Sequence, residues 1–91
     1  MVSVIIKLST RKTKKFMAVF SDGRIIHFGQ KGSSVFYDHK DENKKMNYIK
    51  RHRVNEDWSK IGPASLSRYI LWNKKSLSES IKDFKKRFKL D

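Results

Sequence analysis

Histidines and carboxylates are the side chains here whose types suit catalysis or metal binding, and they gather in the middle of the sequence. Asp38, His39 and Asp41 lie in one short stretch, and His52 follows. On a single helix, His39 and His52 would lie about 220° apart around the axis, so the two rings cannot ligate one metal ion. Asp38 would share a face with Asp41, or with Glu42, and such a pair would hold a hard cation only weakly. We expect these acids to complement the helix dipole, with Asp41 pairing with Lys45.

Motifs of common enzyme classes are missing from the rest of the sequence. There is no cysteine, which excludes thiol catalysis, a disulfide scaffold and the usual zinc fingers. Gly29 and Gly32 are only three residues apart, whereas a phosphate-binding P-loop needs four residues between its glycines, so we expect a plain turn over residues 29–34. No serine lies in a Gly-x-Ser-x-Gly motif. We therefore predict no catalysis, no cofactor and no bound metal.

Positive charge is the dominant property of the chain. Lysine and arginine total 22 against 9 acids, which gives a formal net charge of +13. An excess of this size favours a polyanionic partner, most commonly nucleic acid, with an acidic membrane surface or an acidic protein as alternatives. Lysine supplies 16 of the 22 basic residues. Because lysine acts as a point charge, this composition favours phosphate contacts over the reading of base edges.

The basic residues fall into three patches: the first loop, the middle helix and the C-terminal region. We predict that nucleic acid binds through Arg11, Lys12, Lys14 and Lys15, through Lys40, Lys44, Lys50, Arg51 and Arg53, and through Lys74, Lys75, Lys82, Lys85 and Lys86. Three aromatic residues near element ends lie beside basic groups and are candidates for base stacking: Trp58, Trp72 and Tyr37. For each tryptophan, we favour the alternative in which the side chain anchors a loop on the core.

The first basic patch, on the first loop, is predicted to lie between β-strands. The composition of residues 4–8, 15–20 and 24–28 predicts three antiparallel strands, and Asp22-Gly23 between the last two is a strong hairpin signal. Because side chains alternate along a strand, Phe16, Ala18 and Phe20 should share the core face.

The middle patch is predicted on a helix over residues 38–53, with acids in its first turns and basic residues in its last. At 100° per residue, one arc of this helix is polar and basic. Met46 and Ile49 should lie opposite it, with Tyr48 and His52 beside them. The residues on the polar arc are Lys40, Lys44, Asn47 and Arg51.

Two further helices are predicted after a loop over residues 54–62. Pro63 suits the first position of a helix over residues 63–72, with Leu66, Tyr69 and Ile70 facing inward. Ser76-x-x-Glu79 forms a capping box at the start of the last helix. The apolar stripe of that helix, which should pack against the sheet, consists of Leu77, Ile81, Phe84 and Phe88.

The expected fold is a small single α+β domain over residues 1–91, β-rich over 1–30 and helical over 38–90. An N-terminal antiparallel hairpin or three-stranded sheet should be packed by two to three α-helices. No apolar run approaches the roughly 20 residues of a membrane span. Residues 1–3 do not begin a secretory signal, so we expect a protein that is not secreted.

Several short motifs resemble a known family when taken in order. They are Lys15-Phe16-Met17-Ala18-Val19-Phe20, Asp22-Gly23, His27-Phe28-Gly29, His39-Lys40-Asp41, Tyr48-Ile49-x-Arg51-His52, Trp58, Leu71-Trp72-Asn73-Lys74, Ser76-Leu77 and Ser80-Ile81-x-Asp83. From Phe16 onward, about four-fifths of the chain resembles an uncharacterised family of small basic proteins from large nucleocytoplasmic DNA viruses and some large phages. The N-terminal strand lies outside this resemblance. The chain departs from the family pattern at Val35-Phe36, where an acid is usual, and at Lys75, where proline is usual.

The family has no assigned activity, so the resemblance implies a viral setting, in the virion or in the cytoplasm or nucleus of the host cell. Together with the charge, it predicts a small protein that binds nucleic acid, DNA in preference to RNA, largely without sequence specificity. Genome packaging, the virion interior, or replication and transcription are the expected settings. The alternative is a minor capsid or cement protein whose cationic surface meets acidic viral protein. A small metal-dependent nuclease is a remote alternative.

Overall fold

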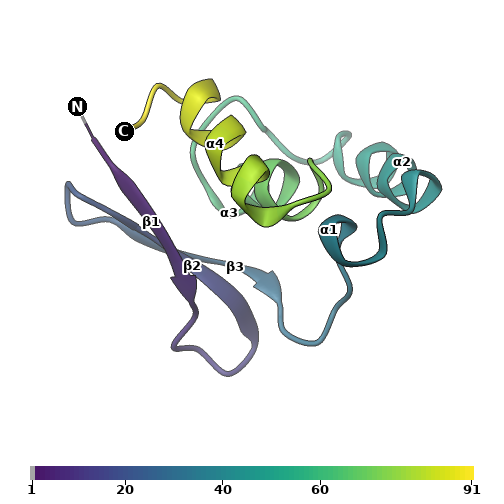
Figure 1. Ribbon diagram of the computed structural model, residues 1–91, viewed down its shortest axis with the longest axis horizontal. Helices are drawn as coiled ribbons and strands as arrows, with labels where there is room; N and C mark the ends of the chain where they lie inside the picture. Colours follow the sequence, from purple (N-terminus) through teal and green to yellow (C-terminus); the bar gives the residue numbers. More distant parts are fainter. Residues whose placement is uncertain (1) are drawn as a thin grey trace.

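Three antiparallel strands form the N-terminal part of the computed structural model, which describes residues 2–91 (Figure 1). The strands are β1 (Val4–Leu8), β2 (Lys14–Phe20) and β3 (Ile25–Gln30), in the order β1-β2-β3. Helices follow the sheet in the chain and cover one of its faces. The structure therefore confirms the predicted α+β fold with a three-stranded sheet.

The predicted hairpin joins β2 to β3 through residues 21–24, and three of these lie between the hydrogen-bonded Phe20 and Arg24. The Phe20 N–H donates to the Arg24 carbonyl at 2.9 Å, and the Gly23 N–H donates to the Phe20 carbonyl at 3.0 Å. Gly23 has a φ of 99°, which glycine adopts without the steric cost that a Cβ would bring. This is the three-residue hairpin geometry in which glycine takes the left-handed position.

Alternation along the strands separates a covered face from an open face. Phe16 pairs with Phe28 and Val4 pairs with Phe20, and this face contributes to the core. On the other face, Ile5, Val19 and Ile25 are direct cross-strand partners and form one row over all three strands. Ile5 and Ile25 are more than half exposed, so no helix covers this row.

Gly29 belongs to β3, which corrects the prediction that the turn begins at this residue. It has a φ of 78°, and a Cβ built on it would lie 2.8 Å from Leu71 Cδ1 and 3.1 Å from Lys15 Cβ. This close approach leaves space for hydrogen only. The strand continues to Gln30 because Gln30 pairs with Lys14 of β2.

The predicted helix over residues 38–53 is in fact two helices, α1 (Phe36–His39) and α2 (Glu42–His52). Lys40 between them is left-handed, with a φ of 54°. Asp41 is the N-cap of α2, and its carboxylate accepts hydrogen bonds from the backbone N–H of Asn43 and Lys44. The acids therefore start a new helix one turn later than predicted, because a capping carboxylate satisfies N–H groups that lack helical partners.

The buried side of α2 also differs from the prediction. Tyr48 is its buried residue, at 8% exposed, whereas Met46 is 50% exposed. The apolar seam expected at Met46 is thus wrong. The break at Lys40 explains the difference. It lets α2 turn a different side toward the core than a single continuous helix would, while α1 buries Phe36.

The predicted helix over residues 63–72 is confirmed, with a change of type along its length. It begins as α3 (Pro63–Leu66) and continues as η1 (Ser67–Leu71), a π-helical turn closed by the Trp72 N–H on the Ser67 carbonyl at 3.1 Å. Leu66 and Ile70 face inward as predicted and are fully buried. The last helix, α4 (Leu77–Arg87), packs against η1.

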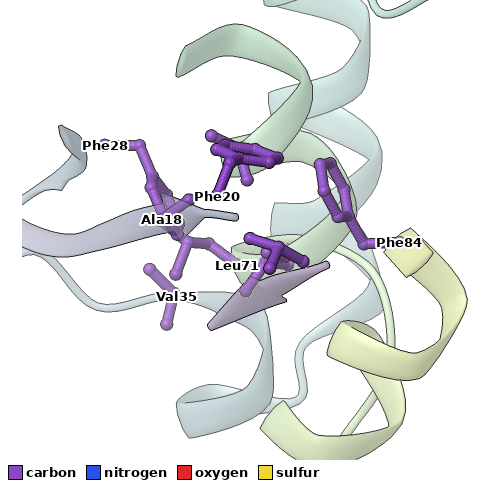
Figure 2. Close-up of a cluster of buried hydrophobic side chains, with 9 residues drawn as sticks. Ala18, Phe20, Phe28, Val35, Leu71 and Phe84 are labelled. Carbon is purple, nitrogen blue, oxygen red and sulfur yellow. The ribbon is translucent and has the colours of Figure 1, made fainter. Parts of the chain in front are cut away.

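The main core lies between the sheet and these helices (Figure 2). Phe84 from α4 is fully buried in it, as predicted, and Phe88 packs partly buried beside it, with ring centroids 4.8 Å apart. Other core members labelled in Figure 2 are Ala18, Phe20, Phe28, Val35 and Leu71.

Ser76 caps α4 as predicted, but only half of the predicted capping box forms, because over residues 2–91 the Glu79 side chain makes no hydrogen bond back to the Ser76 N–H. Removal of the Ser76 hydroxyl should lower stability. Its hydroxyl accepts a hydrogen bond from the Glu79 backbone N–H at 3.2 Å, and the helix begins at Leu77. We expect Ser76→Ala to lower the free energy of unfolding by about 1 kcal/mol. Urea denaturation followed by circular dichroism measures this change. Lys86→Ala, at an exposed position of the same helix, is the control, and equal stability of the two variants would contradict the cap.

Candidate nucleic-acid interface

A column of three aromatic rings connects α2 to the end of η1. The rings of Trp72 and Tyr48 stack with centroids 4.6 Å apart and 8° between their planes. Tyr48 stacks in turn on His52, at 4.2 Å and 26°. Burial, and secondarily the charge of Glu56, raises the pKa of Tyr48 to about 12, so its hydroxyl stays protonated at neutral pH.

A groove of about 730 Å³ runs beside this column, between the end of the sheet, α2 and the start of α3. Ligand sites commonly have volumes of about 300–1,000 Å³. Two predicted nucleic-acid contacts, Lys14 on β2 and Arg51 on α2, line this groove although 37 positions separate them in the sequence. The other lining residues are Phe28, Gly29, Gln30, Ser33, Ser34, Val35, Tyr48, His52, Glu56, Pro63, Ala64, Ser67, Leu71 and Trp72.

A second hollow of about 590 Å³ lies on the outer side of α2. Its lining consists of Lys44, Asn47, Lys50, Arg51 and Trp72. We call these five residues the α2 surface. The structure thus brings three predicted phosphate contacts and one predicted stacking residue together. Arg51 and Trp72 line both the hollow and the groove, so the two spaces adjoin.

The other predicted contacts lie apart from the α2 surface. Arg11 and Lys12 lie on the β1–β2 loop, Lys15 on β2, Lys40 between α1 and α2, Arg53 at the end of α2, Lys74 and Lys75 before α4, and Lys82, Lys85 and Lys86 on α4. The left-handed backbone at Lys40 removes it from the predicted helical arc of Lys44, Asn47 and Arg51. Over residues 2–91, none of the 14 predicted lysine and arginine contacts forms an ion pair.

Trp58 and Tyr37, the other stacking candidates, are held by the protein itself. The Trp58 indole N–H donates to Glu56 at 2.9 Å, and the Arg68 guanidinium lies 5.4 Å from the centre of its ring. The second Glu56 oxygen pairs with His52 Nδ1 at 2.8 Å. Tyr37 packs partly buried against the core. Over residues 2–91, Trp58 thus contacts Glu56 and Arg68 and is not part of the main core, whereas Trp72 packs partly buried against the core, as we favoured for the tryptophans.

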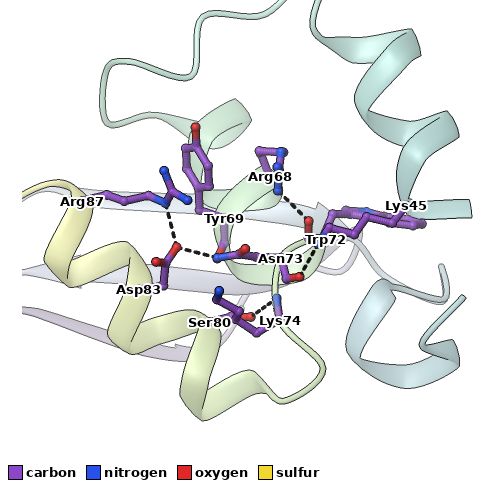
Figure 3. Close-up of polar contacts among 9 residues, drawn as sticks. All are labelled: Lys45, Arg68, Tyr69, Trp72, Asn73, Lys74, Ser80, Asp83 and Arg87. Atoms are coloured by element: carbon purple, nitrogen blue, oxygen red, sulfur yellow. Dashed lines mark hydrogen bonds and ion pairs between the residues drawn. The ribbon is translucent and has the colours of Figure 1, made fainter. Parts of the chain in front are cut away.

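Two cationic side chains donate hydrogen bonds to backbone carbonyl groups just after η1 (Figure 3). Carbonyl groups at the end of a helix lack helical partners. Arg68 Nη1 donates to the Trp72 carbonyl, and Lys45 Nζ donates to the Asn73 carbonyl, both at 2.7 Å. Burial lowers the pKa of both cations from their usual values. The predicted pair between Asp41 and Lys45 is wrong, because Lys45 reaches across to the end of η1 instead.

A polar network then ties this segment to α4 (Figure 3). The buried Asn73 side chain donates to Asp83 at 2.6 Å and to the Tyr69 carbonyl at 3.0 Å. Arg87 Nε also donates to Asp83, at 2.7 Å. Burial alone raises the pKa of Asp83, but the hydrogen bonds from Arg87 and Asn73 outweigh it and hold the pKa below its usual value. This network fixes the backbone that carries Trp72. Asn73 and Asp83 belong to two of the motifs quoted for the family resemblance, but the spacing of these motifs did not indicate that the two side chains bond each other.

Histidines and acids are dispersed across the part of the chain that the structure describes. Over residues 2–91, no three such side chains come together in a way that suits a metal ion. His39 Nδ1 instead accepts a hydrogen bond from the Asp41 backbone N–H at 2.9 Å. Its ring lies 5.3 Å from that of Trp72, whereas His52 stacks on Tyr48.

Comparisons with known proteins identify a family but no function. A family model described as a family of unknown function (DUF5754) matches residues 4–52. The match includes β1, which corrects the expectation that the N-terminal strand lies outside the family. It ends with α2, so the motifs from Trp58 to Asp83 that we counted toward the resemblance lie outside the match. No curated protein and no solved structure matches the chain. Because more than half of its residues match the model, the chain belongs to this family of unknown function, DUF5754.

Proposed function

We propose that this protein binds nucleic acid, DNA in preference to RNA, largely without reading its sequence, and that the α2 surface makes the central contacts. The observation that carries the proposal is the gathering of Lys44, Lys50 and Arg51 around Trp72 in a chain with a net charge of +13. Over the described residues, none of these three cations is neutralised by an acid. Phosphates supply the missing counter-charge.

Phosphate binding explains the preference for lysine. Lysine and phosphate form point-charge contacts that depend little on geometry, whereas specific base recognition relies on bidentate side chains placed in a groove of the duplex. The lysines on α4 lie outside both hollows. They add to the positive field that steers a polyanion toward the protein.

Charge reversal on two helices tests the proposal. The first triple variant, Lys44→Glu, Lys50→Glu and Arg51→Glu, changes the α2 surface, and the matched control, Lys82→Glu, Lys85→Glu and Lys86→Glu, changes the net charge equally on α4. Fluorescence anisotropy with short labelled oligonucleotides of unrelated sequence measures binding. We expect the α2 variant to weaken all sequences alike, and more than the control does. Absence of binding by the parent protein at low salt would contradict the proposal.

A protein partner is the second candidate, and the open face of the sheet favours it. The row of Ile5, Val19 and Ile25 offers apolar area, and Lys7, two residues after Ile5 on the same face of β1, is exposed and forms no ion pair over residues 2–91. Such a face suits an acidic protein, as a minor capsid or cement component would require. We place both candidates in the virion or the infected cell, the setting that the family resemblance implies. Mass spectrometry of purified virions tests that setting, and co-purification with acidic capsid subunits tests the second candidate.

A further inference from the structure

The groove beside the aromatic column has two cationic sides and an apolar base. Lys14 and its cross-strand partner Gln30 line it from the sheet, and Arg51 lines it from α2. Phe28 and Leu71, both almost fully buried, contribute apolar lining between them. A ligand in this groove therefore meets two positive charges beside an apolar surface.

The polar groups of the groove fit an anion. Ser33, Ser34 and Ser67 provide hydroxyl groups. Glu56 is the acid in the lining, and both of its carboxylate oxygens are engaged, one by His52 and the other by Trp58. Its charge is therefore partly satisfied within the protein.

All three rings of the aromatic column line the groove, and His52 is at one end of the stack. His52 stacks on Tyr48, its side chain is 39% exposed, and it lines the groove. Trp72 and Tyr48 behind it line the groove as well. A flat ring entering the groove extends an existing stack, which is how proteins hold the bases of single strands.

We propose that this groove binds a single-stranded segment of nucleic acid, with a backbone phosphate held between Lys14 and Arg51 and a base placed against His52. The inference rests on the proposed function and narrows its substrate to unpaired strands. In a duplex, neighbouring base pairs cover both faces of each interior base, so a duplex offers no free base face to His52. A duplex binds through phosphate contacts alone, on cations such as Lys44 and Lys50 of the α2 surface.

The test compares single-stranded and duplex DNA of the same sequence by fluorescence anisotropy at low salt. The groove variant is Lys14→Gln with Arg51→Gln, and the matched control is Lys85→Gln with Lys86→Gln on α4. We expect the parent to prefer the single strand. We expect the groove variant to lose about ten-fold or more in affinity for the single strand, because two charge-assisted contacts disappear. The control variant should lose a small factor in affinity, and this factor should be the same for single-stranded and duplex DNA.

Substitution of His52 tests the stacking contact separately. His52→Ala should weaken single-strand binding about five-fold or more and leave duplex binding unchanged, while His52→Phe should retain single-strand binding. Circular dichroism shows whether each variant is folded. The groove variant remains informative if His52→Ala unfolds, because over residues 2–91 neither the Lys14 nor the Arg51 side chain forms a hydrogen bond or ion pair.

Two results would overturn the inference, and only the second would also contradict the proposed nucleic-acid binding. Equal affinity for single strand and duplex, with equal losses in the groove and control variants, excludes the groove and leaves nucleic-acid binding intact. Absence of binding to either form by the parent removes the proposed function and this inference together.

Discussion

Raising the salt concentration from about 50 mM to about 200 mM should weaken nucleic-acid binding by about two to four decades. The expectation follows from counterion release, because each phosphate that the protein neutralises adds about 0.9 to the slope of log K against log salt for duplex DNA, and about 0.7 for single strands. A domain with this many unpaired lysine and arginine residues should contact about four to seven phosphates. Anisotropy titrations at several salt concentrations measure the slope.

The charge-reversal variants on α2 provide the control for this prediction. Replacing Lys44, Lys50 and Arg51 by Glu should reduce the slope by at least about two units, since three phosphate contacts are lost. A parent affinity that does not change with salt would contradict an electrostatic interface. A variant whose slope equals that of the parent would place the phosphate contacts elsewhere on the protein.

Phe84→Ala should have the largest effect on stability. The Phe84 ring is fully buried where α4 meets the core, and it packs on the Phe88 ring. Its truncation leaves a cavity and should lower the free energy of unfolding by about 3–5 kcal/mol. A domain of this size has little more stability than that, so we expect a largely unfolded variant at 37 °C.

Thermal unfolding followed by circular dichroism measures the effect of Phe84→Ala. Lys86→Ala is the matched control, because Lys86 is exposed on the same helix and its truncation should change stability by no more than about 0.5 kcal/mol. A melting temperature for Phe84→Ala equal to that of the control would contradict the docking of α4 on the core.

Local signals predicted the sheet and the last helix well. The Asp22-Gly23 turn and the alternation around Ala18 act over a few residues, and so does the Ser76 cap. These features depend on backbone preferences that any neighbouring structure leaves in place. For this reason the hairpin, its core face and the start of α4 were all predictable from the sequence.

The break between α1 and α2 shows where local reasoning was insufficient. Residues 38–53 carry the charge pattern of one helix, and Lys40 has a side chain that favours helices. The left-handed turn at Lys40 is supported instead by packing, since Phe36 of α1 is buried and α2 buries Tyr48. No single stretch of the sequence contains both facts.

The candidate site depends still more on distant contacts. The sequence identified Lys44, Arg51 and Trp72 individually, but distributed the predicted contacts over three patches. The stacking of Trp72 on Tyr48 and the bond from Lys45 to the Asn73 carbonyl gather some of them at one place. These partners are 24 and 28 positions apart. Their meeting is a property of the tertiary fold, which the basic pattern alone does not contain.

The position of Trp72 in the aromatic column depends on the number of residues in the π-helical turn at Ser67–Leu71. A π-helical turn holds about one residue more than an α-helical turn. Deleting one residue there would restore a regular α-helix and rotate the following residue by about 100° relative to the sheet. Trp72 would then leave Tyr48. The loss of a single codon in this turn is therefore expected to remove the stack.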